Sequence, residues 1–283
     1  MAERLSTTGM SDSFENKAMA WQPLTFKGVA SFAHASLNRL FFLQFAVAVA
    51  VACVTVWFVS LGWIPTLEQA IENLRPGAAI DRGRLLWPDD RAERLSEGPF
   101  IEFTASPRGD GAIGQTADLQ VDLTGSELKL RSLFGYLAIP YPAGGAIGLS
   151  PEEAGASWGA WKGPTLALTF LATLVSLSLT WLALGTFYSA PALLFGFYVN
   201  RPTVFAERFK LCMASLLPAA LFFTAAMVLY AVRQLSLVGL LVAWLLHIVL
   251  GWAYVAIAML QLPAERSPKG NPFADARSAG GRT

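Results

Sequence analysis

Few side chains in this sequence have the types and spacing that could do chemistry. The only two histidines are His34 and His247, and the only two cysteines are Cys53 and Cys212. A zinc or iron site needs several convergent N, S or O ligands. We place His34 on the cytoplasmic side and His247 in the middle of the membrane, and both cysteines lie in apolar stretches. No metal ligand and no cofactor-binding residue are predicted.

Metalloprotease and phosphate-binding motifs are also missing. The sequence contains no H-E-x-x-H and no Walker A pattern. Residues 155–159 (GASWG) match G-x-S-x-G by letter, but the pattern of a strand followed by a sharp turn and a helix is not predicted around them. Three serines of the apolar stretches, Ser176, Ser178 and Ser215, could pair with His247, but none stands in a distinctive motif. We therefore predict no catalytic residue and a non-enzymatic protein, with an intramembrane enzyme as the third hypothesis.

Three residues of the apolar stretches are still candidates for function. His247 is one, because ionisable residues inside a membrane are rare. A neutral histidine can also hydrogen-bond a neighbouring helix, and no charged residue accompanies it in a predicted span core, so we favour packing over an ion relay. Pro218 is expected to kink its helix, and Pro191 to start a new helical piece after a break.

The composition identifies the class of protein. Hydrophobic residues make up 54% of the 283 residues and charged residues 14%, whereas a soluble domain carries roughly 25% charged residues. The net charge of +1 gives no basic surplus for nucleic acid. These values predict a membrane protein with several spans and no nucleic-acid partner.

Four uncharged windows are each long enough to cross the hydrocarbon core, which takes about 20 helical residues. They are 40–67, 163–200, 211–232 and 234–264. The second window could hold one pass followed by an interfacial or re-entrant segment, or it could hold two tight passes. One pass leaves 11 Lys/Arg and 6 Asp/Glu on the cytoplasmic side, against 10 and 14 outside. Because cytoplasmic loops are enriched in Lys and Arg, we predict four spans with both termini in the cytoplasm.

The predicted fold class is a membrane α-helical protein with four transmembrane helices. A small extracytoplasmic β-rich (α+β) domain is inserted between helices 1 and 2. The predicted segments are a disordered cytoplasmic N-terminus 1–22, an amphipathic interfacial helix 23–38, helix 1 at 39–65, the extracytoplasmic domain 66–162, helix 2 at 164–188, an interfacial segment and cytoplasmic loop 189–210, helix 3 at 211–232, helix 4 at 236–261, and a disordered cytoplasmic tail 262–283.

Alternating apolar and polar residues predict a hairpin within the domain, with strands at 119–123 and 128–131. Weaker patterns predict strands at 79–87, 99–105 and 136–139. The acidic residues lack the spacing of a calcium loop, so we expect them on a solvated surface; they are Asp81, Asp89, Asp90, Asp118 and Asp122. Three tryptophans flank the domain and are expected to anchor it at the membrane interface: Trp63, Trp158 and Trp161.

The order of these parts resembles a family of bacterial membrane proteins without a settled biochemical role. Some of them are named maltodextrin-utilisation proteins, and they are distantly similar to Yip1-like membrane proteins. The matching stretches are IENLRPGAAIDRGRLLW, TADLQVDLTGSELKLRSLFG and the late block of spans. The resemblance covers most of the chain as architecture and implies no catalytic signature.

Together these patterns predict a non-enzymatic accessory or scaffold protein of the bacterial inner (plasma) membrane. Its partners would be the lipid bilayer and a membrane or envelope protein that contacts the outer domain. The alternative is a transporter or permease component that uses the Pro-broken segment after helix 2 together with His247.

Overall fold

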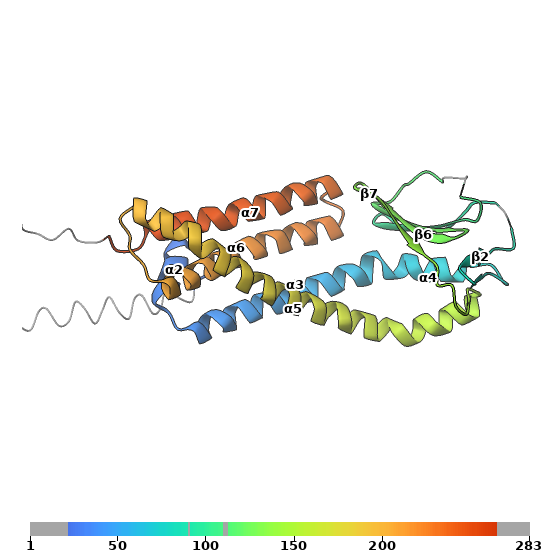
Figure 1. Cartoon of the computed structure of the whole chain (residues 1–283), viewed down its shortest axis with the longest axis horizontal. Helices are drawn as coiled ribbons and strands as arrows, with labels where there is room; N and C mark the ends of the chain where they lie inside the picture. Colours follow the sequence, from blue (N-terminus) through green and yellow to red (C-terminus); the bar gives the residue numbers. More distant parts are fainter. Residues whose placement is uncertain (1–21, 90, 110–112, 265–283) are drawn as a thin grey trace, which may run out of the picture. The chain divides into compact units, whose positions relative to one another are not determined.

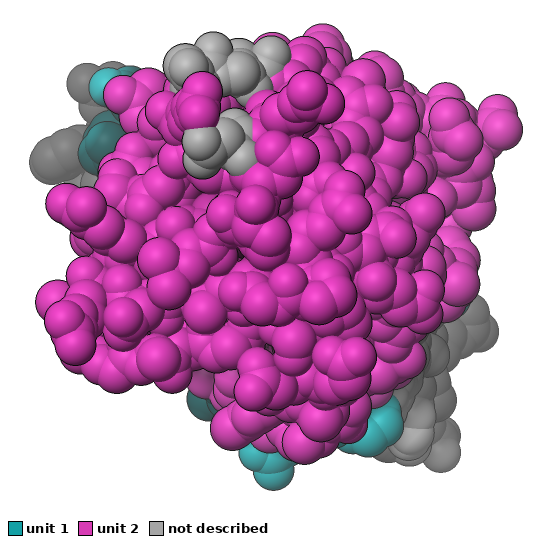
Figure 2. Space-filling view, turned by 90° about the vertical axis from the view of Figure 1, so that its right-hand side faces the viewer, with its two compact units in different colours: residues 1–47, 177–222, 245–283 teal, residues 48–176, 223–244 magenta. Residues whose placement is uncertain are grey.

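The computed structural model describes residues 22–89, 91–109 and 113–264. Residues 1–21 and 265–283, which make up most of the predicted disordered ends, lie outside these ranges. By internal contacts the chain divides into two compact units, coloured separately in Figure 2. Unit 1 comprises 1–47, 177–222 and 245–283, and unit 2 comprises 48–176 and 223–244.

Four helices are long and apolar enough to cross a membrane (Figure 1). The first is α3 (Leu37–Gly62), which α4 (Ile64–Glu72) continues after a break at Trp63. The others are α5 (Pro151–Tyr198), α6 (Phe205–Ala231) and α7 (Leu237–Leu260). The four predicted apolar helices and the small strand-rich region between the first and second are thus confirmed.

Helix α5 differs from the prediction, because it is continuous through residues 189–198. We expected helix 2 to end at 188 and a new segment to begin near Pro191. Packing within unit 1 explains why the helix continues. Ala192 and Gly196 are buried, and a Cβ on Gly196 would lie only 2.7 Å from Met259 Cε on α7. Close packing against α7 therefore overrides the local preference for a break.

The predicted amphipathic helix 23–38 is also corrected. It consists of a short helix α2 (Phe26–Ser31) and a 3-10 turn η1 (Phe32–His34), and α3 begins a new helix at Leu37. The extended backbone of Ala35 separates the two parts. The apolar side of this segment is covered by protein within unit 1; Val29 and Phe32 are both 0% exposed.

In unit 1, α6 is the central helix, and its residues 211–219 are all buried. Gln44 of α3 donates its side-chain N–H to the Met213 carbonyl at 3.3 Å. A Cβ on Gly185 of α5 would collide with Met213, and Gly251 of α7 faces Ala219. Small residues thus let the helix backbones approach one another closely.

Unit 2 contains two sheets. The strands are β1 (Ala79–Asp81), β2 (Arg84–Leu86), β3 (Glu93–Glu97), β4 (Ile101–Ser106), β5 (Leu119–Thr124), β6 (Glu127–Ser132), β7 (Gly135–Pro140) and β8 (Ala146–Gly148). The smaller sheet has the order β2-β1-β8 and the larger one β3-β4-β5-β6-β7. The predicted hairpin is confirmed as β5–β6. The single strand predicted at 79–87 is wrong: Arg82 and Gly83 have positive φ and turn the chain, so β1 and β2 form a hairpin. The sequence patterns missed β3, β8 and the parallel pairing of β4 with β5.

The core of the larger sheet lies between the sheet and α4 (Figure 1). Ala70 and Leu74 of α4 pack there against Leu95 of β3 and Ala105 of β4. These residues come from the apolar positions of the helix and from the inward side of the strands. One face of β3–β5 is therefore fixed to α4.

Candidate functional site

The opposite face of strands β4 and β5 is polar and buried. Its six side chains come from alternate positions of the two strands, and none is more than 3% exposed: Glu102, Thr104, Ser106, Gln120, Asp122 and Thr124. The parallel register pairs Glu102 with Gln120 and Thr104 with Asp122. The expectation that Asp122 lies on a solvated surface is therefore wrong.

Both carboxylates on this face accept two hydrogen bonds each. Glu102 accepts from the Thr116 amide at 3.0 Å and from the Thr116 hydroxyl at 2.6 Å, and Arg94 Nε lies 3.5 Å away. Asp122 accepts from the Thr104 hydroxyl at 3.0 Å and from Arg131 at 3.2 Å. The carboxylates are therefore held in place by the fold, and Thr116 brings the segment between β4 and β5 over this face.

Tyr141, which follows β7, is a further buried polar residue near Asp122. Its hydroxyl is buried and has no hydrogen-bond partner among the described residues. Burial raises the pKa of Tyr141, and the negative charges of Asp122 and Glu127 raise it further. The hydroxyl stays protonated at neutral pH, so Tyr141 adds no negative charge to this side of the sheet.

The β6–β7 hairpin, by contrast, is apolar and exposed. Leu133 and Phe134 at its turn are 60% and 77% exposed, and Tyr136, Leu137 and Ile139 of β7 are 74%, 59% and 42% exposed. We call these five residues the hairpin surface. A cluster of exposed large apolar side chains is typical of an interaction site rather than of an ordinary soluble face.

Strand β7 is also an open edge of the sheet. It pairs with β6 on one side only, and each of its six residues is exposed. Natural edge strands are commonly protected by charged residues, but residues 135–140 include none. Apart from Pro140 at its end, β7 can therefore offer backbone N–H and C=O groups to an added strand.

The sheet is also attached to the apolar helices of unit 2. The Tyr230 hydroxyl of α6 donates to Asp118 at 2.5 Å. The Tyr230 ring lies 4.9 Å from the ring of Phe100 and 5.5 Å from that of Phe58 of α3. Leu133 shares a cavity of about 360 Å³ with residues 236–238 at the start of α7. The hairpin surface is thus presented beside the end of a spanning helix.

The three predicted tryptophan anchors lie on the helices that flank the domain. Trp63 is 37% exposed at the start of α4, and Trp161 of α5 is 66% exposed. Trp158 instead donates its indole N–H to Glu68 at 3.2 Å, and Lys162 binds the same carboxylate at 2.7 Å. Trp158 therefore ties α5 to α4.

The candidate residues of the transporter hypothesis lie in three different helices. Pro191 is an interior residue of the continuous α5, Pro218 is buried inside α6, and His247 is half-buried in α7. The break that Pro191 was expected to make is not observed. One structural argument for a substrate pathway is therefore removed.

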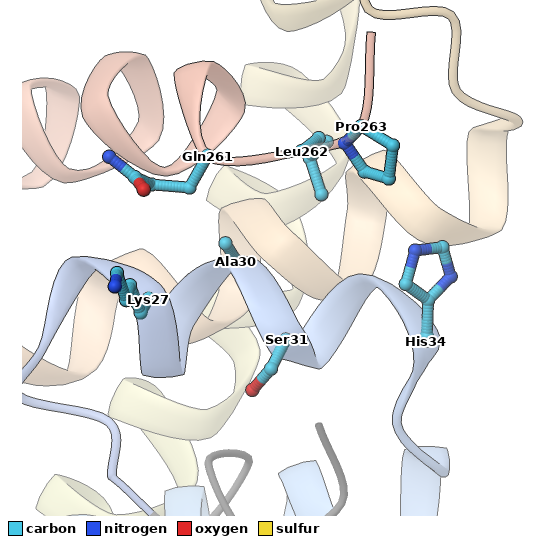
Figure 3. A pocket seen from close by; sticks show the side chains of 7 residues that line it. All are labelled: Lys27, Ala30, Ser31, His34, Gln261, Leu262 and Pro263. Atoms are coloured by element: carbon cyan, nitrogen blue, oxygen red, sulfur yellow. The ribbon is translucent and has the colours of Figure 1, made fainter. Parts of the chain in front are cut away.

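His34 lies at a separate cavity of about 320 Å³ in unit 1 (Figure 3). The cavity is lined by Lys27 of α2, by His34 of η1 and by residues 261–263, which follow α7. His34 Nδ1 lies 3.5 Å from Glu207 Oε1. The cavity is mostly apolar, and Lys27, His34 and Gln261 add polar side chains to its wall that the sequence patterns did not indicate.

Comparison of the chain with protein-family models, with curated proteins and with solved structures finds no match. The family resemblance described above therefore stays a prediction. The candidate site rests on the geometry of this chain alone.

Proposed function

We propose that this protein is a non-enzymatic accessory or scaffold protein of the bacterial inner membrane, whose sheet domain binds a protein partner through the hairpin surface. The observation that carries the proposal is the exposed, uncharged edge strand β7 with its apolar side chains. The partner would add a strand to β7 and cover Leu137 and Ile139 with its own apolar residues.

The charge distribution supports a cytoplasmic position for both termini and an outer position for the domain. The described residues of unit 1 include five Lys or Arg and one Glu, whereas those of unit 2 include ten Lys or Arg and twelve Asp or Glu. An excess of Lys and Arg is typical of the cytoplasmic side. The partner would therefore be a protein of the envelope or of the same membrane.

Copurification tests the proposal. The chain with a C-terminal tag is extracted in mild detergent, and the eluted species are identified by mass spectrometry and native size. We expect a stoichiometric partner, and we expect the double variant Leu137→Lys with Ile139→Lys to weaken its binding at least about tenfold, since each apolar side chain contributes roughly 1.5–3 kcal/mol on burial.

The matched control is Leu86→Lys, because Leu86 is 52% exposed on β2, the edge strand of the smaller sheet. This variant should retain the partner. Elution of the wild-type chain alone, or equal retention of the partner by the hairpin variant, would contradict the proposal.

A further inference from the structure

The turn between α5 and α6, residues 199–204, is built around a helix cap. Asn200 has φ of 54°, and the Arg201 amide donates to the Gly196 carbonyl at 2.8 Å. The Asn200 amide donates to the Phe197 carbonyl at 3.2 Å, and the two hydrogen bonds together form a Schellman motif. The motif places Arg201 and Thr203 at the wall of a cavity of about 230 Å³.

Arg208, in the first turn of α6, is buried, and no acidic residue among those the structure describes forms an ion pair with it. It is 8% exposed, and its guanidinium donates to the Thr203 carbonyl. Its Nε is buried and has no partner among the residues that the structure describes. The neighbouring acid, Glu207, accepts from the Val204 amide at 3.1 Å and faces His34. Glu207 is the sole acidic residue in the described part of unit 1.

The position of Arg208 in the first turn of α6 makes its buried positive charge more unfavourable. The first turn of a helix has unpaired N–H groups and the positive end of the helix dipole, where a cation is disfavoured and an anion is stabilised. Arg201 adds a second positive charge at the cavity that Thr203 lines. Two arginines and a helix N-terminus thus create a positive potential that a phosphate group would neutralise.

The surroundings of the two arginines are apolar and exposed. Leu194, Phe197 and Tyr198 at the end of α5 are 62%, 78% and 83% exposed. Val204 and Phe205, at the start of α6, are 64% and 56% exposed. Aromatic and aliphatic side chains around a basic turn at the end of a spanning helix suit the boundary between headgroups and acyl chains.

We propose that the α5–α6 turn binds the phosphate of an anionic phospholipid, with Arg201 as its ligand and Arg208 as a buried positive charge beside it. Arg201 would contact the phosphate from the cavity wall. The guanidinium of Arg208, which donates to Thr203 of the same wall, would attract the phosphate electrostatically. The acyl chains would lie against the exposed apolar residues of the two helix ends. The site is independent of the hairpin surface.

Thermal unfolding of the purified full-length chain in a neutral detergent tests the proposal, with the midpoint followed by tryptophan fluorescence. Phosphatidylglycerol is titrated in, and phosphatidylcholine and glycerol 1-phosphate are titrated in parallel. We expect phosphatidylglycerol to raise the midpoint and the other two compounds to leave it unchanged. Arg201→Gln should raise the half-saturating concentration of phosphatidylglycerol at least about tenfold, because its hydrogen bond to the charged phosphate is lost. Arg208→Gln should raise it as well, because a nearby positive charge is removed.

Without lipid, Arg208→Gln should unfold at or above the wild-type midpoint, because the uncompensated buried charge is gone. The matched control is Arg233→Gln, which removes an exposed arginine at the other end of α6 and should keep the wild-type response. If Arg208→Gln does not fold, Arg201→Gln carries the same test. Equal responses of the Arg208 or Arg201 variant and the control would overturn the site. Equal midpoint shifts with glycerol 1-phosphate and with the lipid would assign the site to a soluble phosphate compound.

Discussion

At the scale of single residues, the buried carboxylate of Glu102 gives the sharpest prediction. Removing it in Glu102→Ala leaves the amide and hydroxyl of Thr116 without their acceptor, while Arg94 keeps its ion pair with Glu97. We expect a loss of about 1–3 kcal/mol in the free energy of opening the sheet, because two hydrogen bonds to a charged group are lost. Native-state hydrogen exchange of the β4 and β5 amides in the solubilised full-length chain measures this value.

Glu97→Ala is the matched control for that substitution. Glu97 also pairs with Arg94, at 2.9 Å, but its side chain is 55% exposed. An exposed pair contributes less than about 1 kcal/mol. If the two variants opened the sheet equally, the polar face would not depend on the Glu102 network.

The residues of this network show where sequence patterns fail. Alternation predicted the strand at 119–123, but it assigned the polar positions to solvent, because period-two patterns cannot tell which side a later segment covers. Strand β4 carries Glu102 and Thr104 in the same alternation, and two adjacent strands with matching polar positions are the signal that was available. Arg208 was similarly interpreted as one charge of a cytoplasmic loop, since its burial depends on packing in three dimensions.

At the scale of elements, the close contact of α5 with α6 leads to a second prediction. A side chain at Gly185 would collide with Met213, whereas Gly163 of the same helix has open space around its Cα. We expect Gly185→Leu to destabilise the protein by about 1–3 kcal/mol through overpacking. Gly163→Leu should be neutral or stabilising, because leucine is a better helix former than glycine.

Thermal midpoints from fluorescence-detected gel filtration compare the two variants with the wild type. The expected order places Gly185→Leu below the wild type and Gly163→Leu at or above it. Equal thermal midpoints of the two variants would contradict a close contact between α5 and α6 at Gly185. The length of α5 past Pro191 was not predictable from sequence, because the contacts at Gly196 that hold the helix come from α7.

At the scale of the whole molecule, the charge asymmetry predicts the orientation in the membrane. In a background with Cys53→Ala and Cys212→Ala, a cysteine is placed at Leu133 or at Asn200, both of which are exposed. We expect a membrane-impermeant maleimide to label Leu133→Cys in intact cells and Asn200→Cys only after permeabilisation. The reverse pattern would place the sheet domain in the cytoplasm.

The length of α5 has a consequence for the kind of bilayer that suits this protein. Its 48 residues span about 72 Å at 1.5 Å per residue, while the 24 residues of α7 span about 36 Å, close to the roughly 30 Å of a hydrocarbon core. A long helix can match a thicker bilayer by standing more upright, whereas α7 has little length in reserve. Longer lipid chains would thus strain α7 first, so α7 sets the upper limit of membrane thickness that this chain tolerates.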